Sequence, residues 1–397
     1  MSAGKINRER PGEPRGRADD ADAKRSMTGM PPDRSFWRGK RVVLTGHTGF
    51  KGAWLALWLR RMGAEVTGIA LAADEPSLYR LVDLETTIAS KTIDLRDAAA
   101  IASAVRAARP QVVFHLAAQA LVRASYREPL ATFATNTMGT AHLLDALREV
   151  PDARVAVVVT TDKVYLNREW AYPYREGDAL GGHDPYSASK AAAELVAASY
   201  RSAFLQAQGV AVATARAGNV IGGGDWCEDR LIPDAVRAWS TGAVLHVRRL
   251  GAIRPWQHVL DPLAGYLRLA EKLWESPALA NAYNFGPRTD EAASVGTVLA
   301  LAREAYGMGE WIADAEEGGP HEAGRLALEV ARARAELGVS ARWSLGEAIE
   351  RTMRWYRNQR DGASALALCE ADIADHEATP DTVAAVLAAS PGPGRTA

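Results

Sequence analysis

The stretch that decides the fold runs from residue 41 to residue 52 and reads RVVLTGHTGFKG. It begins with a short apolar run, Arg41 to Thr45, which is typical of a buried strand. Gly46, Gly49 and Gly52 follow, and a helical pattern of apolar residues continues to Met62. Glycines at such a turn let the backbone approach a pyrophosphate, and the helix N-terminus supplies amide donors and a partial positive charge. The sequence therefore predicts a dinucleotide-binding turn, spaced G-x-x-G-x-x-G rather than G-x-G-x-x-G.

Short apolar runs and helical patterns go on alternating after this turn. The runs cover residues 65–70, 112–114, 155–159 and 210–215, and helical segments separate them. Strands that are apolar on both faces indicate a parallel sheet covered by helices on both sides. We therefore expect an α/β fold with a Rossmann-like, doubly wound parallel sheet. The alternation ends after Gly218, where we expect a smaller C-terminal substrate-binding lobe to begin.

The predicted organisation has four parts. Residues 1–35 are highly charged and poor in apolar side chains, so we expect a disordered tail. Residues 36–218 form the predicted nucleotide-binding Rossmann domain. Residues 219–358 mainly form the substrate-binding lobe, with some segments returning to the Rossmann domain. Residues 359–397 form an Ala-rich extension of one or two weak helices and a loose end.

The overall composition narrows the class of protein. The 397 residues carry 47 Lys and Arg against 48 Asp and Glu, a net charge of −1, which argues against a nucleic-acid partner. No stretch approaches the ~20 apolar residues of a membrane span, and the N-terminus lacks the apolar core of a signal peptide. Two distant cysteines predict neither a disulfide framework nor a metal site. We therefore expect a cytoplasmic protein with no membrane partner.

Candidate catalytic residues follow the run at 155–159. Tyr186 and Lys190 lie one helical turn apart, and a neighbouring ammonium can lower the pKa of a phenol by favouring its phenolate. Thr161 ends the strand and can bond the same substrate hydroxyl as Tyr186. Asp162 and Lys163 come next and add an acid and a base, unless they form only a surface ion pair.

The type of dinucleotide stays open at this point. The second strand ends Gly68-Ile69-Ala70, without an acidic residue to hold a ribose hydroxyl, so the pattern does not separate NAD from NADP. Asp94 follows the third strand, where it could receive an adenine amino group. It could equally be the N-cap of the next helix.

With these residues in place, the chain resembles the extended short-chain dehydrogenases/reductases, and among them the nucleotide-sugar 4,6-dehydratases that act on CDP-glucose. The resemblance runs from about Phe36 to Trp355. Besides the glycine turn it depends on HLAAQ at 115–119, TDK at 161–163, NREW at 167–170, GGHDPY at 181–186, GNVIGGGDW at 218–226, RLIPD at 230–234 and RPWQHV at 254–259.

The resemblance implies a bound NAD that is reduced and reoxidised within one turnover. Tyr186, with Lys190 and Thr161, would oxidise the sugar at C4. Lys163 would then remove the C5 proton, and Asp162 would protonate the departing C6 hydroxyl. The implied cofactor contacts are Gly46, Thr48, Gly49, Phe50, Gly52, Asp94, Leu95, Ala117, Ala118, Gln119, Asn136, Tyr186 and Lys190. The implied contacts to the nucleotide sugar are Asn219, Arg230 and Arg254.

Two other functions fit the same fold. A C4 epimerase of a nucleotide sugar would not need Asp162 and Lys163, and a non-catalytic NAD-binding protein would not need to keep Tyr186 and Lys190. The segment at 247–250 lacks the Asn-Pro pair usual in the resembled family, which leaves the nucleotide base open. The helical segments at 126–147 and 186–205 could pair subunits, and the resemblance implies a homo-oligomer, a dimer or a tetramer.

Overall fold

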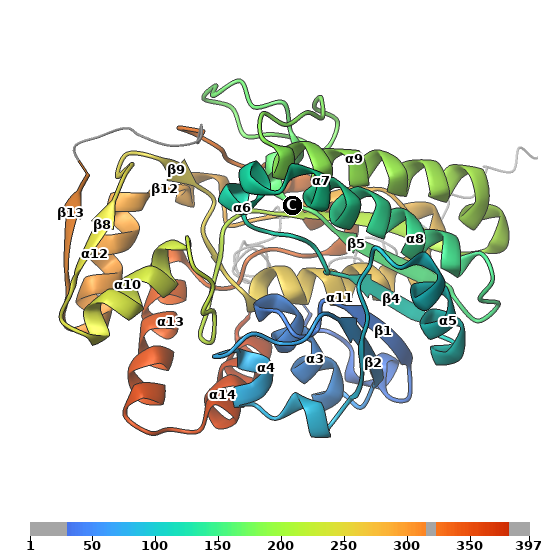
Figure 1. Cartoon of the computed structure of the whole chain (residues 1–397), viewed down its shortest axis with the longest axis horizontal. Coiled ribbons are helices and arrows are strands. Elements are labelled where there is room, and N and C mark those ends of the chain that lie inside the picture. Colours follow the sequence, from blue (N-terminus) through green and yellow to red (C-terminus); the bar gives the residue numbers. More distant parts are fainter. Residues whose placement is uncertain (1–29, 315–322, 381–397) are drawn as a thin grey trace, which may run out of the picture.

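The computed structural model describes residues 30–314 and 323–380, and its centre is a sheet of seven parallel strands (Figure 1). In the order β11-β6-β5-β4-β1-β2-β3, the strands are β11 (Ala282–Phe285), β6 (Ala211–Ala217), β5 (Val155–Val159), β4 (Val112–His115), β1 (Arg41–Thr45), β2 (Glu65–Ala70) and β3 (Ala89–Thr92). All six strand pairings are parallel. The predicted Rossmann-like fold class is confirmed.

Helices cover both faces of the sheet, as Figure 1 shows. One face packs against α3 (Phe50–Arg61) and α11 (Leu260–Glu275), and the other packs against α5 (Ala98–Ala108), α8 (Gly139–Leu147) and α9 (Pro185–Tyr200). Successive residues of β1 serve different faces. Val42 and Leu44 belong to the core around α3 and α11, whereas Val43 belongs to the core around α5 and α8. This alternation follows from the two-residue period of a strand.

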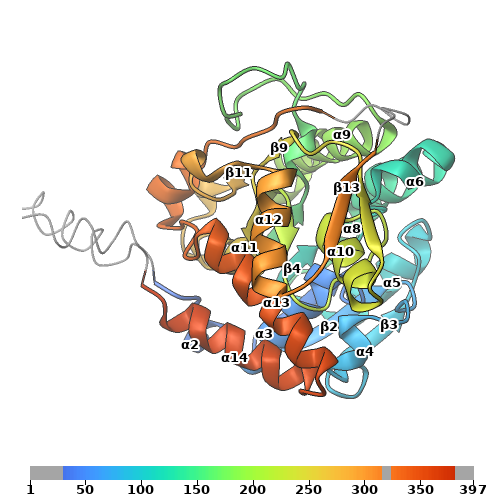
Figure 2. The same ribbon diagram turned by 90° about the vertical axis from the view of Figure 1, so that its left-hand side faces the viewer.

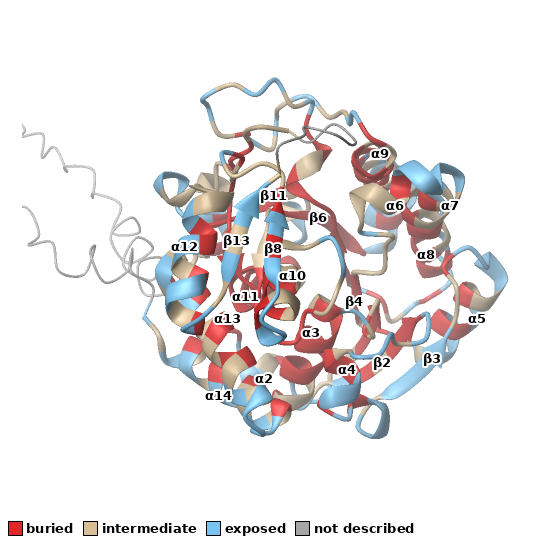
Figure 3. Cartoon of the chain, turned by 60° about the vertical axis from the view of Figure 1, so that its left-hand side comes forward, coloured by how far each residue is buried: buried red, intermediate tan, exposed pale blue. Residues whose placement is uncertain are grey.

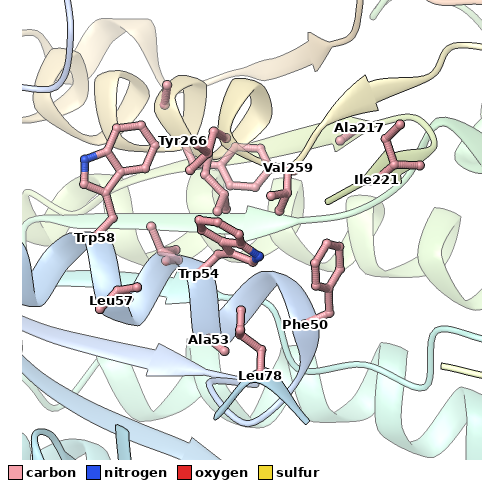
Figure 4. Close-up of a cluster of buried hydrophobic side chains, with 14 of the residues drawn as sticks. Phe50, Ala53, Trp54, Leu57, Trp58, Leu78, Ala217, Ile221, Val259 and Tyr266 are labelled. Carbon is pink, nitrogen blue, oxygen red and sulfur yellow. The ribbon is translucent and has the colours of Figure 1, made fainter. Parts of the chain in front are cut away.

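Large aromatic side chains fill the core under the glycine turn. Trp54 and Trp58 lie one turn apart on α3, and both are fully buried. In Figure 4 they point from α3 towards Tyr266 and Val259. The Trp54 indole nitrogen donates to the Gly223 carbonyl oxygen at 2.9 Å, which satisfies its polar atom. This packing fixes the start of α3, where the candidate nucleotide site begins.

The lobe lies beside the sheet and contains three two-stranded units (Figure 2). They pair β7 (Val220–Ile221) with β10 (Gln257–His258), β9 (Ile253–Arg254) with β12 (Ala293–Ser294), and β8 (Val244–Val247) with β13 (Glu310–Ala313). The lobe's helices are α10 (Leu231–Ser240), α12 (Val295–Tyr306) and α13 (Leu345–Arg360). Two segments after residue 218, β11 and α11, pack with the Rossmann sheet instead.

The helical segment expected at 126–147 is divided in the structure. It consists of α6 (Val122–Arg127), α7 (Pro129–Phe133), the π-helical turn η2 (Ala134–Met138) and α8. The remaining short helices are α4 (Leu78–Leu81), η1 (Leu84–Thr86), η3 (Asp162–Val164), η4 (Arg201–Leu205), η5 (Gln206–Gln208), η6 (Pro277–Leu279), η7 (Thr289–Glu291) and η8 (Ala333–Leu337). Among the described residues, none of these helices is long and apolar enough to cross a membrane.

The described parts of both predicted tails, residues 30–35 and 359–380, belong to the folded body, which corrects the sequence interpretation for those residues. At the N-terminal end, α2 (Arg34–Trp37) buries Trp37, and the Asp33 amide donates to Glu271 of α11 at 2.8 Å. The boundary expected at residue 35 therefore falls inside a helix, while residues 1–29 lie outside the described part. At the other end, α14 (Ala365–Ala378) buries Cys369, Ile373 and His376. The burial colours of Figure 3 show these inward faces.

A helix was expected in this extension and α14 provides one, but its attachment to the folded body was not expected. The amino-acid composition does not reveal why α14 packs on the body, because polar groups distant in sequence also bind it. The Arg342 guanidinium donates to the carbonyl oxygens of His376 and Thr379, at 2.7 and 2.8 Å. The His376 ring also bonds Asp261 at 3.0 Å. Residues 381–397, where a loose end was expected, lie outside the described part of the chain.

Candidate active site

A large cleft opens where β1, β4, β5 and β6 end, between the sheet and the lobe. Its volume is about 1510 Å³, which exceeds the ~300–1,000 Å³ of a pocket for one small ligand. In doubly wound sheets, ligands bind outside the carboxyl ends of the strands. All but one of the predicted site residues line it: Gly46, Thr48, Gly49, Phe50, Gly52, Asp94, Leu95, Ala117, Ala118, Gln119, Thr161, Asp162, Lys163, Tyr186, Lys190, Asn219, Arg230 and Arg254. The cleft has room for a dinucleotide and a nucleotide sugar together.

The three glycines of the first turn have different steric roles. Gly46 has a φ of +77°, and a Cβ there would lie 2.6 Å from the Ala117 amide nitrogen. A Cβ on Gly52 would lie 2.0 Å from the Gly46 carbonyl oxygen, so only glycine allows α3 to pack on the turn. Gly49 is the N-cap of α3 and meets nothing closer than 3.5 Å. The start of α3 thus lines the cleft with room beside Gly49, which fits a pyrophosphate at a helix N-terminus.

His47, inside the same turn, is buried and was missed by the sequence analysis. Its ring nitrogen Nε2 lies 2.7 Å from Ser90 Oγ of β3, and burial lowers its pKa to about 4. A Cβ on Gly68 would lie 2.4 Å from the ring, so Gly68 is glycine to make room for His47. The available signal was this pairing of a histidine with a glycine on the neighbouring strand.

Asp94 lies at the edge of the cleft, and its role as a helix N-cap is excluded. The N-cap of α5 is Asp97, whose side chain accepts from the Ala100 amide at 2.9 Å. Both Asp94 carboxylate oxygens accept from Arg96 Nε, at 3.0 and 2.9 Å. Hydrogen bonding to Arg96 is also the main reason that the pKa of Asp94 is lowered. The carboxylate is thus held in its ionised form at the cleft.

Asn136 is the one predicted site residue that the structure does not bring to the cleft wall. Its Oδ1 accepts from the Gln119 amide at 2.8 Å, and its Nδ2 donates to the Gln119 carbonyl and to Ser189 Oγ, at 3.0 and 2.9 Å. Asn136 therefore joins the loop after β4 to α9. It orders the segment that carries Ala117, Ala118 and Gln119 from behind.

Tyr186 is buried at the base of the cleft, and its acidity differs from the expectation. Burial raises the pKa of Tyr186 to about 12, although a hydrogen bond with Thr161 and the charge of Arg230 act in the opposite direction. Burial outweighs the charges that favour the phenolate, so the net direction is opposite to the one expected from Lys190 alone. Lys190 Nζ instead donates to the Val159 carbonyl at 2.8 Å, and burial lowers its own pKa to about 8.

Asp162 is a buried acid next to these groups. Its burial excludes the interpretation of Asp162 and Lys163 as a plain surface ion pair. Its side chain is almost completely buried, and its Oδ1 accepts from Thr161 Oγ1 at 3.0 Å. Its Oδ2 has no hydrogen-bond partner among the described residues. Burial raises the pKa of Asp162, while Lys163 acts against that rise. A raised pKa favours the protonated form of this carboxyl group, which can donate a proton.

Cationic side chains line the lobe side of the cleft. Arg230 Nη1 donates to Asp225 at 2.8 Å, and Arg254 donates to the carbonyl oxygens of Ile253 and Ala323. These bonds hold both guanidinium groups in place beside the cleft. Fixed guanidinium groups suit a diphosphate because their donors match its oxygens.

Lys51 is a further cleft residue to which the sequence analysis gave no role. Its Nζ donates to the Tyr266 hydroxyl at 3.1 Å and lies over that ring. Its pKa is lowered to about 7, first by burial and then by the charges of Lys190 and Arg230. A lysine in the first turn of an otherwise apolar helix was the signal that could have marked it.

Known proteins resemble this chain over most of its length. The model of the family described as GDP-mannose 4,6 dehydratase matches residues 43–352. The chain belongs to this family. It is 44% identical to CDP-glucose 4,6-dehydratase of Salmonella typhimurium over 352 residues, which is 87% of this chain and 98% of the relative. It is also 32% identical to dTDP-glucose 4,6-dehydratase of Streptomyces antibioticus, over 67% of this chain and 76% of the relative.

Solved structures share the fold at lower sequence identity. One is a UDP-glucose 4-epimerase from Stenotrophomonas maltophila with bound NAD and formylated UDP-arabinopyranose. It covers 82% of this chain and 100% of its own, at a TM-score of 0.71 and 22% identity. Since identity is this low, the match supports the fold alone.

Proposed function

We propose that this protein is an NAD-dependent CDP-glucose 4,6-dehydratase, a hydro-lyase that converts CDP-glucose to CDP-4-keto-6-deoxyglucose. The observation that carries the proposal is the buried Asp162, which lies with Lys163 beside Thr161, Tyr186 and Lys190 in one cleft. The relative that matches 98% of its own length acts on CDP-glucose, which supports the choice of nucleotide.

The glycine turn and the free start of α3 would hold the pyrophosphate of the dinucleotide, with Asp94 near its adenine end. NAD, when bound, supplies a hydride acceptor that returns the same hydride within one turnover. Its positive ring near Tyr186 would also favour the phenolate, against the burial that raises the phenol's pKa. Lys190 adds a second positive charge one turn away.

The protein's own residues divide the proton transfers of the proposed reaction. Tyr186, with Thr161, takes the proton of the sugar's C4 hydroxyl as that carbon is oxidised. The resulting ketone acidifies the C5 proton, which Lys163 removes. Asp162 gives its proton to the C6 hydroxyl, which leaves as water. Hydride addition at C6 and return of a proton from Lys163 to C5 would then complete the product. The buried Asp162 suits its role as the acid at C6, because a raised pKa favours the protonated carboxyl group.

A C4 epimerase is the second candidate within the same fold, and Asp162 argues against it. Epimerisation needs no acid at C6, so burying an unsatisfied carboxyl oxygen there would only cost stability. A non-catalytic binding protein would likewise have no need of Tyr186, Lys190 and Thr161 together.

The mass of the product tests the proposal. The protein would be incubated with CDP-, dTDP-, GDP- and UDP-hexoses, and the products weighed by mass spectrometry. We expect CDP-glucose to lose the mass of one water. An unchanged mass with an inverted C4 centre would identify an epimerase. Unchanged substrate in every case would leave only binding and would contradict the proposal.

We also propose that the protein forms a homo-oligomer through the face made by α7, η2 and α9. Leu130, Met138 and Leu195 are exposed there by 84%, 51% and 62%. Figure 1 shows α7 and α9 on the same side of the sheet. Light scattering after gel filtration tests the proposal: Leu130→Glu combined with Leu195→Glu should give a monomer. Ile312 is exposed on β13, so the control variant Ile312→Glu should leave the mass of the oligomer unchanged.

A further inference from the structure

The short catalytic segment Thr161–Val164 is held at both ends by side chains that take no part in the proposed chemistry. On its N-terminal side, Thr160 Oγ1 donates to Glu194 at 2.5 Å. On its C-terminal side, the Tyr165 hydroxyl accepts from Arg216 Nη1 at 3.0 Å and donates to Asn284 of β11 at 2.6 Å. The segment is therefore fixed between two anchor points.

Glu194 connects these anchors to α9. It lies one turn after Lys190 and two turns after Tyr186, and its side chain is only 4% exposed. Besides Thr160, its carboxylate accepts from Thr214 Oγ1 at 2.7 Å and from Arg216 Nη2 at 2.8 Å. One carboxylate thus joins the end of β5 to β6.

Arg216 extends the same connection across the sheet. Its side chain is also 4% exposed, and it donates to Glu194, to the Tyr165 hydroxyl and to the Glu176 carbonyl at 3.1 Å. Its guanidinium lies over the Tyr165 ring, 5.0 Å from the ring centre. A buried ion pair with this many hydrogen bonds holds the strands and the helix that carry it in one arrangement. Removing either partner would leave an uncompensated buried charge.

We propose that Glu194 and Arg216 are positioning residues, which act through two separate effects. Arg216, with Glu194, holds Thr161, Asp162 and Lys163 at a fixed distance from α9. The negative charge of Glu194 in addition keeps Lys190 protonated next to Tyr186. The inference rests on the proposed dehydratase function and assigns that site a supporting ion pair.

The charge effect predicts a change in pH dependence. Glu194, on the same helix, is the charged group that raises the pKa of Lys190, and Lys190 in turn lowers the pKa of Lys51 on α3 and of His115 on β4. Burial lowers the pKa of Lys190 to about 8, and Glu194 opposes that lowering. Without the Glu194 charge, the pKa of Lys190 falls further. Lys190 would then lose its proton, and its effect on Tyr186, at a lower pH.

The experiment measures cofactor reduction in a single turnover, from the absorbance of reduced nicotinamide on mixing with CDP-glucose. All variants carry Lys163→Met, so that the reaction stops after oxidation at C4. Glu194→Gln removes the charge and keeps the size, and Arg216→Lys keeps a charge but cannot bond Glu194 and Tyr165 together. The matched control is Glu271→Gln, which alters the buried Arg268–Glu271 pair of α11, outside the cleft.

We expect Glu194→Gln to slow reduction at least tenfold and to move the alkaline limb of its pH profile about one unit lower. Arg216→Lys should slow reduction without moving that limb, and Glu271→Gln should change neither. If Glu194→Gln does not fold, Glu194→Asp replaces it: a slower rate with an unmoved limb is then expected. The charge effect is overturned if the alkaline limb of the pH profile stays in place in folded Glu194→Gln, or if it moves equally in Glu271→Gln. The positioning effect is overturned if Arg216→Lys leaves the rate of cofactor reduction unchanged. Failure of the unaltered enzyme to reduce its cofactor would instead refute the proposed function.

Discussion

Tyr186 and Lys163 serve different steps of the proposed reaction, so their losses should stop the enzyme at different points. Tyr186→Phe removes the only group that takes the C4 proton, and cofactor reduction should stop. Lys163→Met leaves that step intact, so reduced cofactor should build up on mixing with CDP-glucose. The net rate should fall by about 10²–10⁴-fold, the usual contribution of a general base.

Solvent deuterium provides the sharper measurement for Lys163. The unaltered enzyme should exchange the C5 proton with deuterated water, and Lys163→Met should lose that exchange while Asp162→Asn keeps it. Mass spectrometry of recovered substrate and product measures the label. If Lys163→Met exchanged C5 as fast as the unaltered enzyme, Lys163 could not be the base.

Lys51 gives a second prediction at the scale of single residues, concerning stability and pH. It lines the cleft, and its pKa is about 7 in the folded state against about 10.4 when unfolded. Between pH 7 and pH 10 the unfolded chain therefore binds one proton more, and stability rises with pH. Lys51→Met should raise the free energy of unfolding at pH 7 by roughly 2 kcal/mol, and the gain should shrink towards pH 10.

Urea unfolding at several pH values would measure this difference. Lys91→Met, at an exposed position on β3, is the matched control and should change stability little at any pH. If Lys51→Met changed the free energy of unfolding equally at pH 7 and pH 10, the folded state would not lower the pKa of the Lys51 amine. The stabilised variant should bind the anionic nucleotide sugar less tightly, because the cleft loses one positive charge.

At the scale of elements, the turn between β1 and α3 makes a prediction that separates packing from binding. Gly52→Ala would place a methyl group against the Gly46 carbonyl, so we expect loss of folding or a strongly lowered melting temperature. Gly49→Ala meets nothing closer than 3.5 Å, so its melting temperature should stay near that of the unaltered protein. Its NAD affinity should still fall, measured by calorimetry, because the methyl group lies where the pyrophosphate would approach. Equal NAD affinity would place the pyrophosphate elsewhere.

Helix α14 provides the second test at this scale. Arg342 bonds the last carbonyl groups of α14, and the truncation Arg342→Ala would leave them unpaired and buried. We expect a loss of about 2–4 kcal/mol of stability, because several hydrogen bonds to a charged donor disappear together. Arg354→Ala, which removes an exposed pair with Glu350, should cost less than about 1 kcal/mol. Similar losses for both variants would show that α14 does not depend on Arg342.

The same elements show what could be read from the sequence. Strands β1, β2 and β5 lie where the apolar runs predicted them, because a strand buried on both faces leaves a continuous apolar signal. Helix α14 was expected, but its attachment was not, because that attachment depends on Arg342 and Asp261, which are distant in sequence. The acidity of Tyr186 was misjudged for a related reason: residue spacing places Lys190 nearby but does not report how deeply both groups are buried.

For the whole molecule, the main question is whether the two halves of the reaction occur in one enclosed site. The cleft is bounded by the sheet on one side and by α10 and β9 of the lobe on the other. The glycine turn, the catalytic groups, Arg230 and Arg254 all line this one cleft. A hydride that is stored on a bound cofactor can therefore return to the same sugar before either ligand leaves.

This arrangement predicts a reaction with no net change in redox state. NAD should copurify with the protein, and turnover of CDP-glucose should need no added reductant. Acid extraction followed by chromatography would identify the bound dinucleotide and distinguish NAD from NADP. During turnover, stopped-flow absorbance should show reduced cofactor rising and then falling to its starting level, and Tyr186→Phe should hold the cofactor without that rise. Consumption of NADH in proportion to product would mean that the hydride comes from outside the site, and the internal transfer would have to be abandoned.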